Sequence, residues 1–226
     1  SSREESRRQE DRSEKDRHQE SGREEDHRQV ERGLSGLLHR YGASEIEGAA
    51  ALLKAGGVLA YPTEAVFGLG CDPQNLAACE RVFALKQRPP EQGVLLIGAD
   101  FAQLEPYLAL DQVPEERLQV ARASWPGPHT WVFPRSAAVP PWVCGGHEGI
   151  AVRVTAHEPA AALCRAFGGA LVSTSANPHD QPPARTAQEV AAYFGDGPDG
   201  LLLAPVGGDA APSSIRDVLS GAIIRA

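Results

Sequence analysis

The apolar residues of this chain follow helical spacing in some segments and form short continuous runs in others. Apolar positions three and four apart predict amphipathic helices, whereas short apolar runs bounded by Gly or Pro predict buried strands. Helices are predicted over residues 44–54, 76–86, 101–110, 114–124, 158–167 and 186–194. Strands are predicted over residues 58–61, 93–97, 130–133, 150–154, 170–174, 201–206 and 222–225.

Turn residues mark the ends of several of these segments. Gly56 and Gly57 follow the first helix, as glycine commonly does at a helix C-terminus. Asn75 is a favourable N-cap for the second helix, and the pair Pro89-Pro90 prevents that helix from continuing. Helices and apolar strands alternate without an internal repeat, which predicts an α/β fold: a single domain with a twisted, open, mixed sheet flanked by helices.

The N-terminal residues differ from the rest of the chain. Residues 1–32 hold nine Lys or Arg and eleven Asp or Glu, and Val30 is their only aliphatic residue. Such a segment has no apolar stripe to offset its ordering entropy, so we predict a disordered charged tail over 1–33 and a folded domain over 34–226. Pairs of opposite charge four residues apart could form a transient helix there, and a transient partner for the tail is an open alternative.

The composition narrows the class of protein. The formal charge of −8 disfavours a general nucleic-acid binder, although a local basic patch remains possible. No apolar run reaches the roughly 18–20 residues of a membrane-spanning helix and no signal-peptide core is present, so we expect a cytoplasmic protein without membrane contact. The four cysteines form no C-x-x-C pair, and G-x-G-x-x-G and Walker A sequences do not occur. A protein-bound metal, a dinucleotide site of that type and a P-loop are therefore not predicted.

Three polar segments follow predicted strands or helices, where open α/β sheets place their ligand crevice. The first comes after the strand that ends near Pro62. There Thr63 offers a hydroxyl, and Gly68 and Gly70 permit close approach of the main chain to a ligand. A tight turn capped by the Thr63 side chain explains the same residues equally well.

The second polar segment lies at the end of the helix over 76–86. Lys86 and Arg88 are two residues apart and would diverge on a continuing helix, but where the helix unwinds before Pro89 they can converge on one anion. An ammonium and a forked guanidinium together suit a polyphosphate. Solvated basic residues at a helix C-terminus are the alternative interpretation.

The third polar segment follows the strand over 170–174. Ser173, Thr174, Ser175 and Asn177 supply three hydroxyls and an amide where this strand leaves the core. Hydroxyl and main-chain N–H groups in such a turn can cradle a phosphate. A Ser/Thr turn leading into the proline-rich residues that follow is the alternative, and the absence of a G-x-S-x-G sequence disfavours a nucleophilic serine.

Arg153 stands in an otherwise apolar strand, Ile150 to Val154. A strand covered on both faces excludes arginine unless a carboxylate is close by. That carboxylate could belong to a ligand, which we favour, or to an internal Asp or Glu.

Six strings in this order resemble the YrdC/TsaC family of threonylcarbamoyl-AMP synthases, over about residues 56–226. They are AYPTEAVFGLGCDP, LKQRP, SWPGPHTWVFP, AVRVTAHEP, LVSTSAN and PSSIRDVLSG. Each string alone is weakly specific, whereas six in family order are strongly specific. The chain resembles the short form of the family, because no sequence follows this domain.

The resemblance implies a YrdC-like catalytic domain over 34–226, with a large concave cavity. It implies a nucleotidyltransferase that converts L-threonine, bicarbonate or CO₂, and ATP carrying Mg²⁺ to threonylcarbamoyl-AMP and diphosphate. Partner proteins would then transfer the threonylcarbamoyl group to the adenosine next to the anticodon in tRNAs that read A-starting codons. Weak direct binding of tRNA is an open possibility, and no organic prosthetic group is implied.

The resemblance also implies roles for individual residues. Lys86 and Arg88 match the family's K-x-R, which implies catalytic contacts with the ATP phosphates. Thr63, Arg153 and Ser173 match positions that bind threonine, with Arg153 on its carboxylate. Ser175, Asn177 and Ser213 match positions around ATP.

Two departures from the family pattern bear on the ATP contacts. Gln92 stands where many relatives carry a basic residue or Asn, and residues 178–183 are proline-rich where relatives often carry hydroxyls. Two other classes of function remain open. One is a non-enzymatic RNA-binding module, which the acidic charge disfavours, and the other is a carbamoyl-transfer domain of the type found in hydrogenase-maturation proteins.

Overall fold

The computed structural model describes residues 38–208 and 213–225. The predicted tail over residues 1–33 lies outside the described residues. The described strands are β1 His39–Tyr41, β2 Leu59–Pro62, β3 Phe67–Gly70, β4 Leu95–Gly98, β5 His129–Pro134, β6 Gly149–Val154, β7 Leu171–Ser175, β8 Gly200–Leu202, β9 Ser214–Asp217 and β10 Ile223–Arg225. The helices are α2 Ile46–Lys54, α3 Leu76–Lys86, α4 Phe101–Leu104, α5 Glu115–Ala123, α6 Pro141–Cys144, α7 Glu158–Phe167 and α8 Ala187–Phe194.

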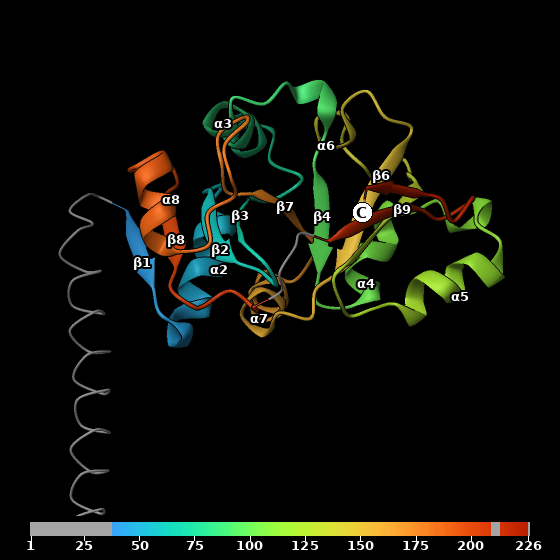
Figure 1. The fold of residues 1–226 in the computed structure, drawn as a ribbon, viewed down its shortest axis with the longest axis horizontal. Coiled ribbons are helices and arrows are strands. Elements are labelled where there is room, and N and C mark those ends of the chain that lie inside the picture. Colours follow the sequence, from blue (N-terminus) through green and yellow to red (C-terminus); the bar gives the residue numbers. More distant parts are fainter. Residues whose placement is uncertain (1–37, 209–212, 226) are drawn as a thin grey trace, which may run out of the picture. The chain divides into compact units, whose positions relative to one another are not determined.

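The ten strands form one mixed sheet in the order β1-β8-β2-β3-β7-β4-β6-β5-β9-β10 (Figure 1). Four neighbouring pairs are parallel: β1/β8, β2/β8, β4/β6 and β5/β9. The remaining pairs are antiparallel, including β3/β7 and β7/β4 at the centre. The predicted α/β fold with a single mixed sheet is therefore confirmed.

Two apolar clusters cover the two faces of the sheet. Leu59 and Tyr61 of β2 belong to one cluster, whereas Val58 and Ala60 belong to the other, as side chains that alternate along a strand must. Helices α2 and α7 pack side by side on the first face (Figure 1), and helix α3 packs on the second. No helix in the described part of the chain is long and apolar enough to cross a membrane.

Several predicted elements match the structure closely. Helices α3 and α7 have the predicted bounds, and the Asn75 side chain accepts a hydrogen bond from the Ala78 amide at 3.0 Å, as an N-cap does. The helix predicted over 101–110 was too long, because α4 is followed there by two short 3₁₀ turns, Glu105–Tyr107 and Leu110–Gln112. The strand predicted over 201–206 was also too long, since β8 ends at Leu202.

Strands β1, β3 and β9 and helix α6 were not predicted, and residues 67–70, which were expected in a polar loop, instead form the buried strand β3. Glycine is unfavourable in an isolated strand, but β3 is held between β2 and β7 on both edges. A side chain at Gly70 would place its Cβ 2.6 Å from the Val172 carbonyl oxygen. Gly70 thus allows the two strands to approach closely.

Candidate active site

A cavity of about 540 Å³ opens beside the central strands of the sheet. It is lined by residues from β2–β3, the segment after α3, β4, β5, β6, β7 and the C-terminal hairpin β9–β10. Six of the eight residues proposed from the sequence line it: Thr63, Arg88, Arg153, Ser173, Ser175 and Ser213. The structure therefore brings most of the predicted polar segments to one place.

The sheet register explains why three of these strands contribute side chains to one surface. Leu95 of β4 lies opposite Ser173 of β7, and Ile97 lies opposite Arg153 of β6. Since residues paired across two strands project to the same face of the sheet, Ser173 and Arg153 lie on the face against which α2 and α7 pack. The cavity lies on this face, beyond the part that these helices cover.

Thr63 occupies a tight turn between β2 and β3. Its hydroxyl donates a hydrogen bond to the Val66 carbonyl at 2.7 Å, and its own amide donates to the same carbonyl at 3.0 Å. The interpretation of Thr63 as a turn cap is therefore correct. Thr63 also lines the cavity, where its hydroxyl oxygen retains lone pairs that can accept a hydrogen bond from a ligand.

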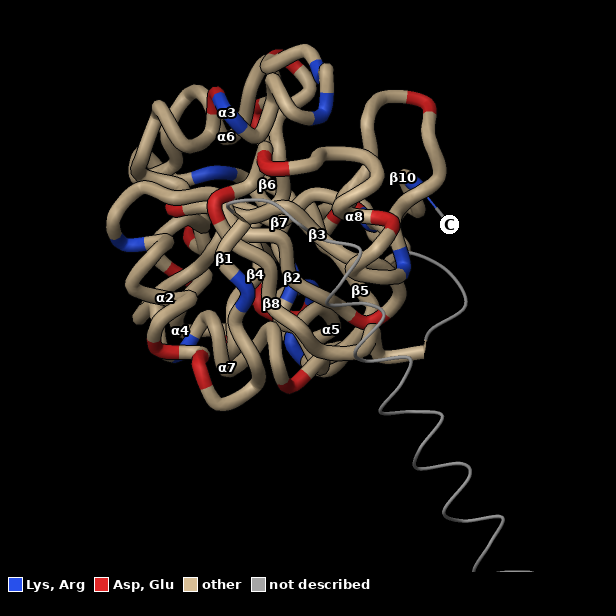
Figure 2. The backbone as a smooth tube through the Cα atoms, turned by 90° about the vertical axis from the view of Figure 1, so that its left-hand side faces the viewer, with Lys and Arg blue, Asp and Glu red and all other residues tan. Residues whose placement is uncertain are grey.

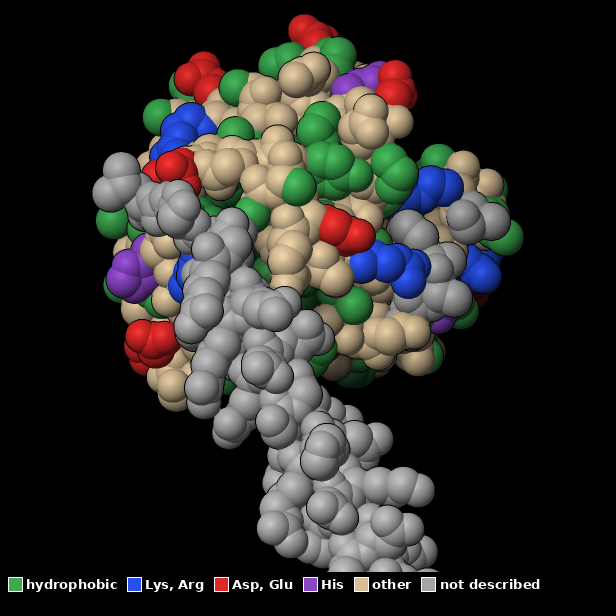
Figure 3. All heavy atoms as spheres, turned by 60° about the vertical axis from the view of Figure 1, so that its left-hand side comes forward, with side chains coloured by type: hydrophobic (Ala, Val, Ile, Leu, Met, Phe, Trp, Pro, Cys, Tyr) green, Lys and Arg blue, Asp and Glu red, His purple; other side chains and the backbone are tan. Residues whose placement is uncertain are grey.

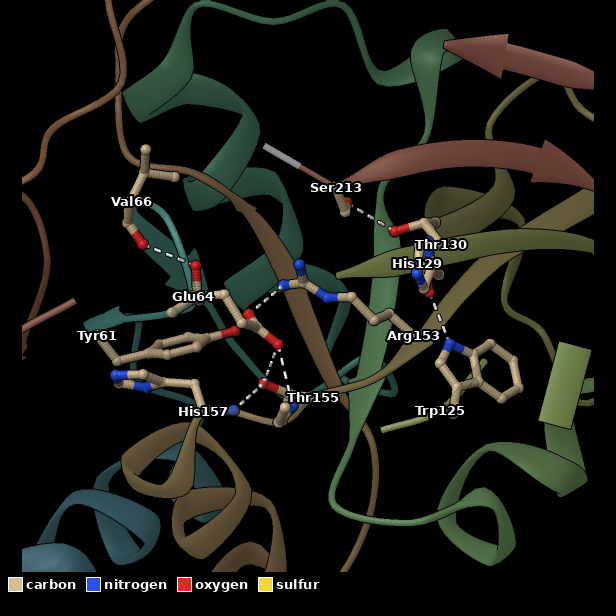
Figure 4. Close-up of polar contacts among 12 residues, drawn as sticks. Tyr61, Glu64, Val66, Trp125, His129, Thr130, Arg153, Thr155, His157 and Ser213 are labelled. Carbon is tan, nitrogen blue, oxygen red and sulfur yellow. Dashed lines mark hydrogen bonds and ion pairs between the residues drawn. The ribbon is translucent and has the colours of Figure 1, made fainter. Parts of the chain in front are cut away.

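Arg153 faces an internal carboxylate. One of its terminal nitrogens lies 3.3 Å from Glu64 Oε2, and both side chains are more than nine-tenths buried (Figure 4). The internal ion pair weighed from the sequence is thus present, and Arg153 lines the cavity as well. Glu64 stands next to Thr63 in the same string, yet the sequence analysis gave it no role.

Lys86 does not line the cavity. Its ammonium is buried and donates to the main-chain oxygens of Ser175 and Asn177, the latter at 2.9 Å, and contacts Asn177 Oδ1 at 3.3 Å. Burial, together with the nearby charge of Arg88, lowers the pKa of Lys86 to about 8. In this structure the side chains of Lys86 and Arg88 therefore do not point to a common anion site, although the sequence predicted that they could bind one anion together.

Asn177 also lies outside the set of cavity-lining residues. Its side-chain nitrogen donates to the carbonyls of Pro178 and Gln181, at 3.0 and 2.8 Å, and so shapes the proline-rich loop. The His179 amide donates to the Lys86 carbonyl at 2.9 Å. The end of α3 and the loop after β7 are thus tied together beneath the cavity.

Arg88 and Arg225 form a second cationic region of the cavity. Arg88 donates to the Gln92 carbonyl at 3.2 Å, while Arg225 donates to the Ser213 carbonyl at 3.1 Å. Burial and the charge of Arg225 lower the pKa of Arg88. Two guanidinium groups held close enough to repel each other favour an anionic ligand. The sequence contained no local pattern that pointed to Arg225, which comes from the last described strand.

The cavity also has apolar lining residues, among them Pro128, Val132, Ile215 and Ile224. Ser213 lines it as well, with its hydroxyl 2.8 Å from that of Thr130. Apolar side chains together with a few hydroxyls suit a flat heterocycle attached to a sugar.

The cavity holds few groups suited to a metal. Glu64 and Glu148 are the carboxylates among its lining residues, and the part of the chain that the structure describes contains no group of three or more potential ligating side chains.

The two departures from the family pattern, at Gln92 and within residues 178–183, both concern the cavity. Gln92 and Pro183 are among its lining residues.

Comparison with known proteins identifies the family of this chain. The Sua5/YciO/YrdC family, described as telomere recombination, matches residues 51–226. A threonylcarbamoyl-AMP synthase of Halorhodospira halophila is 57% identical over 177 residues, covering 78% of this chain and 92% of the relative. A second threonylcarbamoyl-AMP synthase, from Stenotrophomonas maltophilia, is 52% identical and covers 80% of this chain and 97% of the relative.

The chain belongs to this family. The predictions of the family and of a threonylcarbamoyl-AMP synthase, a nucleotidyltransferase, are confirmed by these relatives. Among solved structures, P. abyssi Sua5 complexed with L-threonine superposes with a TM-score of 0.74 at 31% identity, over 80% of this chain and 54% of that longer one. E. coli YciO, at 22% identity, shares the fold with a TM-score of 0.73 over 83% of this chain and 94% of its own.

Proposed function

We propose that this family member forms threonylcarbamoyl-AMP in the cavity described above, from L-threonine, bicarbonate or CO₂, and ATP. The observation that carries the proposal is that one cavity combines two guanidinium regions, at Arg153 and at Arg88 with Arg225, with apolar lining residues. The reaction needs a place for one carboxylate, one polyphosphate and one adenine.

The amino acid is assigned to the part of the cavity formed by Thr63, Arg153 and Ser173. A buried guanidinium favours a carboxylate, because a neutral ligand would leave its donors unpaired. The hydroxyls of Thr63 and Ser173 are placed to bond the polar groups of a small amino acid. The relative whose structure contains L-threonine supports this choice of substrate.

ATP is assigned to the part formed by Arg88, Ser175, Ser213 and Arg225. Arg88 and Arg225 neutralise the phosphates, together with the Mg²⁺ that ATP carries as part of the substrate. Lys86, expected at the phosphates, and Asn177, expected around ATP, are here assigned to shaping the strand end that carries Ser175. A direct contact of Lys86 with phosphate would require it to leave its carbonyl partners.

The chemical step requires no covalent enzyme intermediate. The unprotonated amine of threonine adds to CO₂ and releases a proton to solvent, which gives a carbamate. A carbamate oxygen then attacks the α-phosphorus of ATP. The bond between this phosphorus and the oxygen that bridges it to the β-phosphate breaks, and diphosphate leaves with the electron pair. Catalysis consists of positioning and of neutralising the charge on the departing diphosphate by Arg88 and Arg225.

The product is proposed to pass to proteins that transfer the threonylcarbamoyl group to tRNA in the cytoplasm. Direct RNA binding receives little support from the surface. Basic and acidic residues are interspersed along the backbone in Figure 2, whereas a nucleic-acid binder would gather basic ones over a wide surface. On the face shown in Figure 3, basic side chains gather only in a small area on the right, beside an acidic one.

The decisive experiment is to incubate the purified chain with ATP, Mg²⁺, bicarbonate and one amino acid, and to identify the nucleotide product by mass spectrometry. Threonine should give threonylcarbamoyl-AMP and stoichiometric diphosphate. A parallel reaction contains carbamoyl phosphate in place of threonine and bicarbonate. Product in that reaction alone, or tRNA binding without any nucleotide turnover, would contradict the proposal.

A further inference from the structure

Glu64 is a buried carboxylate in the cavity for which the reaction above has no use. It lies in the turn between β2 and β3, and its side chain is only 7% exposed. A carboxylate buried at this level is strongly unfavourable unless donors surround it, so its contacts indicate what it does.

One oxygen of Glu64 is fixed by the segment between β6 and α7. Oε1 accepts a hydrogen bond from the Thr155 hydroxyl at 2.8 Å and from the Ala156 amide at 3.0 Å (Figure 4). The Thr155 hydroxyl oxygen in turn accepts from the His157 amide at 3.2 Å, next to the first turn of α7. This end of a helix favours negative charge, and the two hydrogen bonds to Oε1 orient the carboxylate.

The main chain of Glu64 is fixed from the other side. The Thr63 amide bonds to the Val66 carbonyl at 3.0 Å, and the Gly207 amide donates to the Thr63 carbonyl at 2.9 Å. A Cβ at Gly207 would come within 2.9 Å of the Glu64 carbonyl oxygen, so this glycine permits the close contact. Glu64 is therefore immobilised in both its main chain and its carboxylate.

The second oxygen, Oε2, lies 3.3 Å from a terminal nitrogen of Arg153, and this contact is an ion pair, since Oε2 makes no hydrogen bond with any described residue. Arg153 Nε is also buried without a partner among the described residues. A guanidinium has five N–H donors, and Glu64 meets it at one nitrogen. The pair thus neutralises Arg153 and limits its rotation without using the donors that a ligand carboxylate requires.

We propose that Glu64 is a positioning residue for amino-acid binding: the geometry assigns it to orienting the Arg153 guanidinium toward the carboxylate of the substrate. This inference rests on the proposed function, in which Arg153 binds that carboxylate. Glu64 contributes to affinity for the amino acid through Arg153 and has no direct part in binding ATP.

The test is a double-mutant cycle on threonine binding, measured by calorimetry with Glu64→Gln, Arg153→Met and the double variant. Gln keeps an oxygen for Thr155 and Ala156 but lacks the charge that holds Arg153. E64Q alone should weaken threonine about tenfold, as loss of a supporting partner does. In the R153M background the same change should alter the affinity by no more than about twofold, because the residue through which Glu64 acts is gone.

Two controls separate positioning from a general structural effect. Binding of a non-hydrolysable ATP analogue should be unchanged in E64Q. Asp199→Asn removes an ion pair with Arg81 outside the cavity, and it should leave threonine affinity unchanged. Equal losses for threonine and the ATP analogue in E64Q, or an equal E64Q effect in both backgrounds, would overturn the proposal.

A spectroscopic measurement covers the case in which R153M binds too weakly for the cycle. The NMR signal of the Arg153 Nε–H group is assigned by its absence in R153M. It should be sharp in the wild type, and in E64Q it should be broadened or lost through exchange with solvent. An unchanged signal contradicts positioning by Glu64. If R153M itself binds threonine as tightly as the wild type, then the assignment of the carboxylate in the proposed function fails, which is a distinct outcome.

Discussion

The ammonium nitrogen of Lys86 lies 2.9 Å from the main-chain oxygen of Asn177 and 3.3 Å from its side-chain oxygen. This contact joins the C-terminus of α3 to the end of β7, two elements separated by some ninety residues. The same ammonium binds the Ser175 carbonyl. Lys86 therefore holds the strand end from which Ser175 faces the cavity, and the first prediction concerns its charge.

Activity should fall as the pH rises through about 8, the pKa to which burial lowers Lys86. Loss of the proton removes the positive charge that all three oxygens share. The pKa is below the ordinary value for lysine, so the folded state binds the proton less tightly than the unfolded chain does. The free energy of unfolding therefore gains from Lys86 between pH 8 and about 10.5. Because deprotonation of Lys86 does not destabilise the fold, global unfolding caused by this residue cannot explain the loss of activity.

The measurement is the pH profile of diphosphate release for the wild type and Lys86→Arg, with thermal melts at each pH. Arginine stays charged throughout this range, so the alkaline decline should disappear or move upward in K86R. A decline at the same pH in K86R would show that another group is responsible.

Arg88→Ala and Arg225→Ala should each weaken ATP binding about 10- to 100-fold, since each removes a charged donor from the phosphate region. Threonine affinity should change little, because Arg153 is retained. Calorimetry with a non-hydrolysable ATP analogue and with threonine measures both effects.

The matched control for these variants is Arg165→Ala. Arg165 is half exposed and pairs with Glu158 on α7, outside the cavity. Its removal should leave both affinities unchanged. If R225A binds ATP like the wild type, then the C-terminal strand has no part in the phosphate site.

Gly68→Ala should raise the KM for threonine about tenfold or more while leaving the KM for ATP unchanged. A Cβ at Gly68 would lie 3.4 Å from Ser173 Oγ and 3.7 Å from Thr63 Cγ2, which are ordinary contacts, so the fold should tolerate it. The added methyl group would occupy space between two residues assigned to threonine, so the bound amino acid would be crowded although the free protein is not, at a cost of about 1–3 kcal/mol.

Gly169→Ala provides the comparison, because its Cβ would meet only the ring of Phe167 at 3.8 Å and lies away from the cavity. Steady-state kinetics and thermal melts of both variants are required. Equal KM values for threonine in G68A and the wild type would place the amino acid elsewhere.

Asp199→Asn should reduce the free energy of unfolding by about 1–2 kcal/mol, mainly by weakening the bond that the Val58 amide donates at 2.7 Å. Arg81 is 44% exposed, so its ion pair contributes less. Burial alone would raise the pKa of Asp199, but the hydrogen bonds from Arg81 and Val58 outweigh it and lower the pKa.

A carboxylate whose pKa is lower in the folded protein than in the unfolded chain stabilises the fold fully at pH values above the unfolded-state pKa. This contribution disappears as the pH falls through the folded-state pKa. The difference between wild type and D199N should therefore be full at pH 7 and shrink below about pH 4. Urea unfolding at several pH values measures it. A difference that is constant with pH would indicate that charge at Asp199 is unimportant.

Much of the fold followed from local sequence. Asn75 and the prolines after Arg88 set the bounds of α3, and the apolar runs set β4, β6 and β7, because capping and burial act over a few residues. Strand β3 could not be predicted in this way. Its glycines are locally unfavourable for a strand, and the neighbours that stabilise it lie far away in sequence.

By itself, the sequence determined the family, the α/β class and six of the residues that line the cavity, because short strings of fixed order carry that information. Only the tertiary structure decided which charges meet: Arg153 with Glu64, Lys86 with the end of β7, and Arg88 with Arg225. Electrostatic interactions depend on distance in space and on burial, and neither can be inferred from separation along the chain.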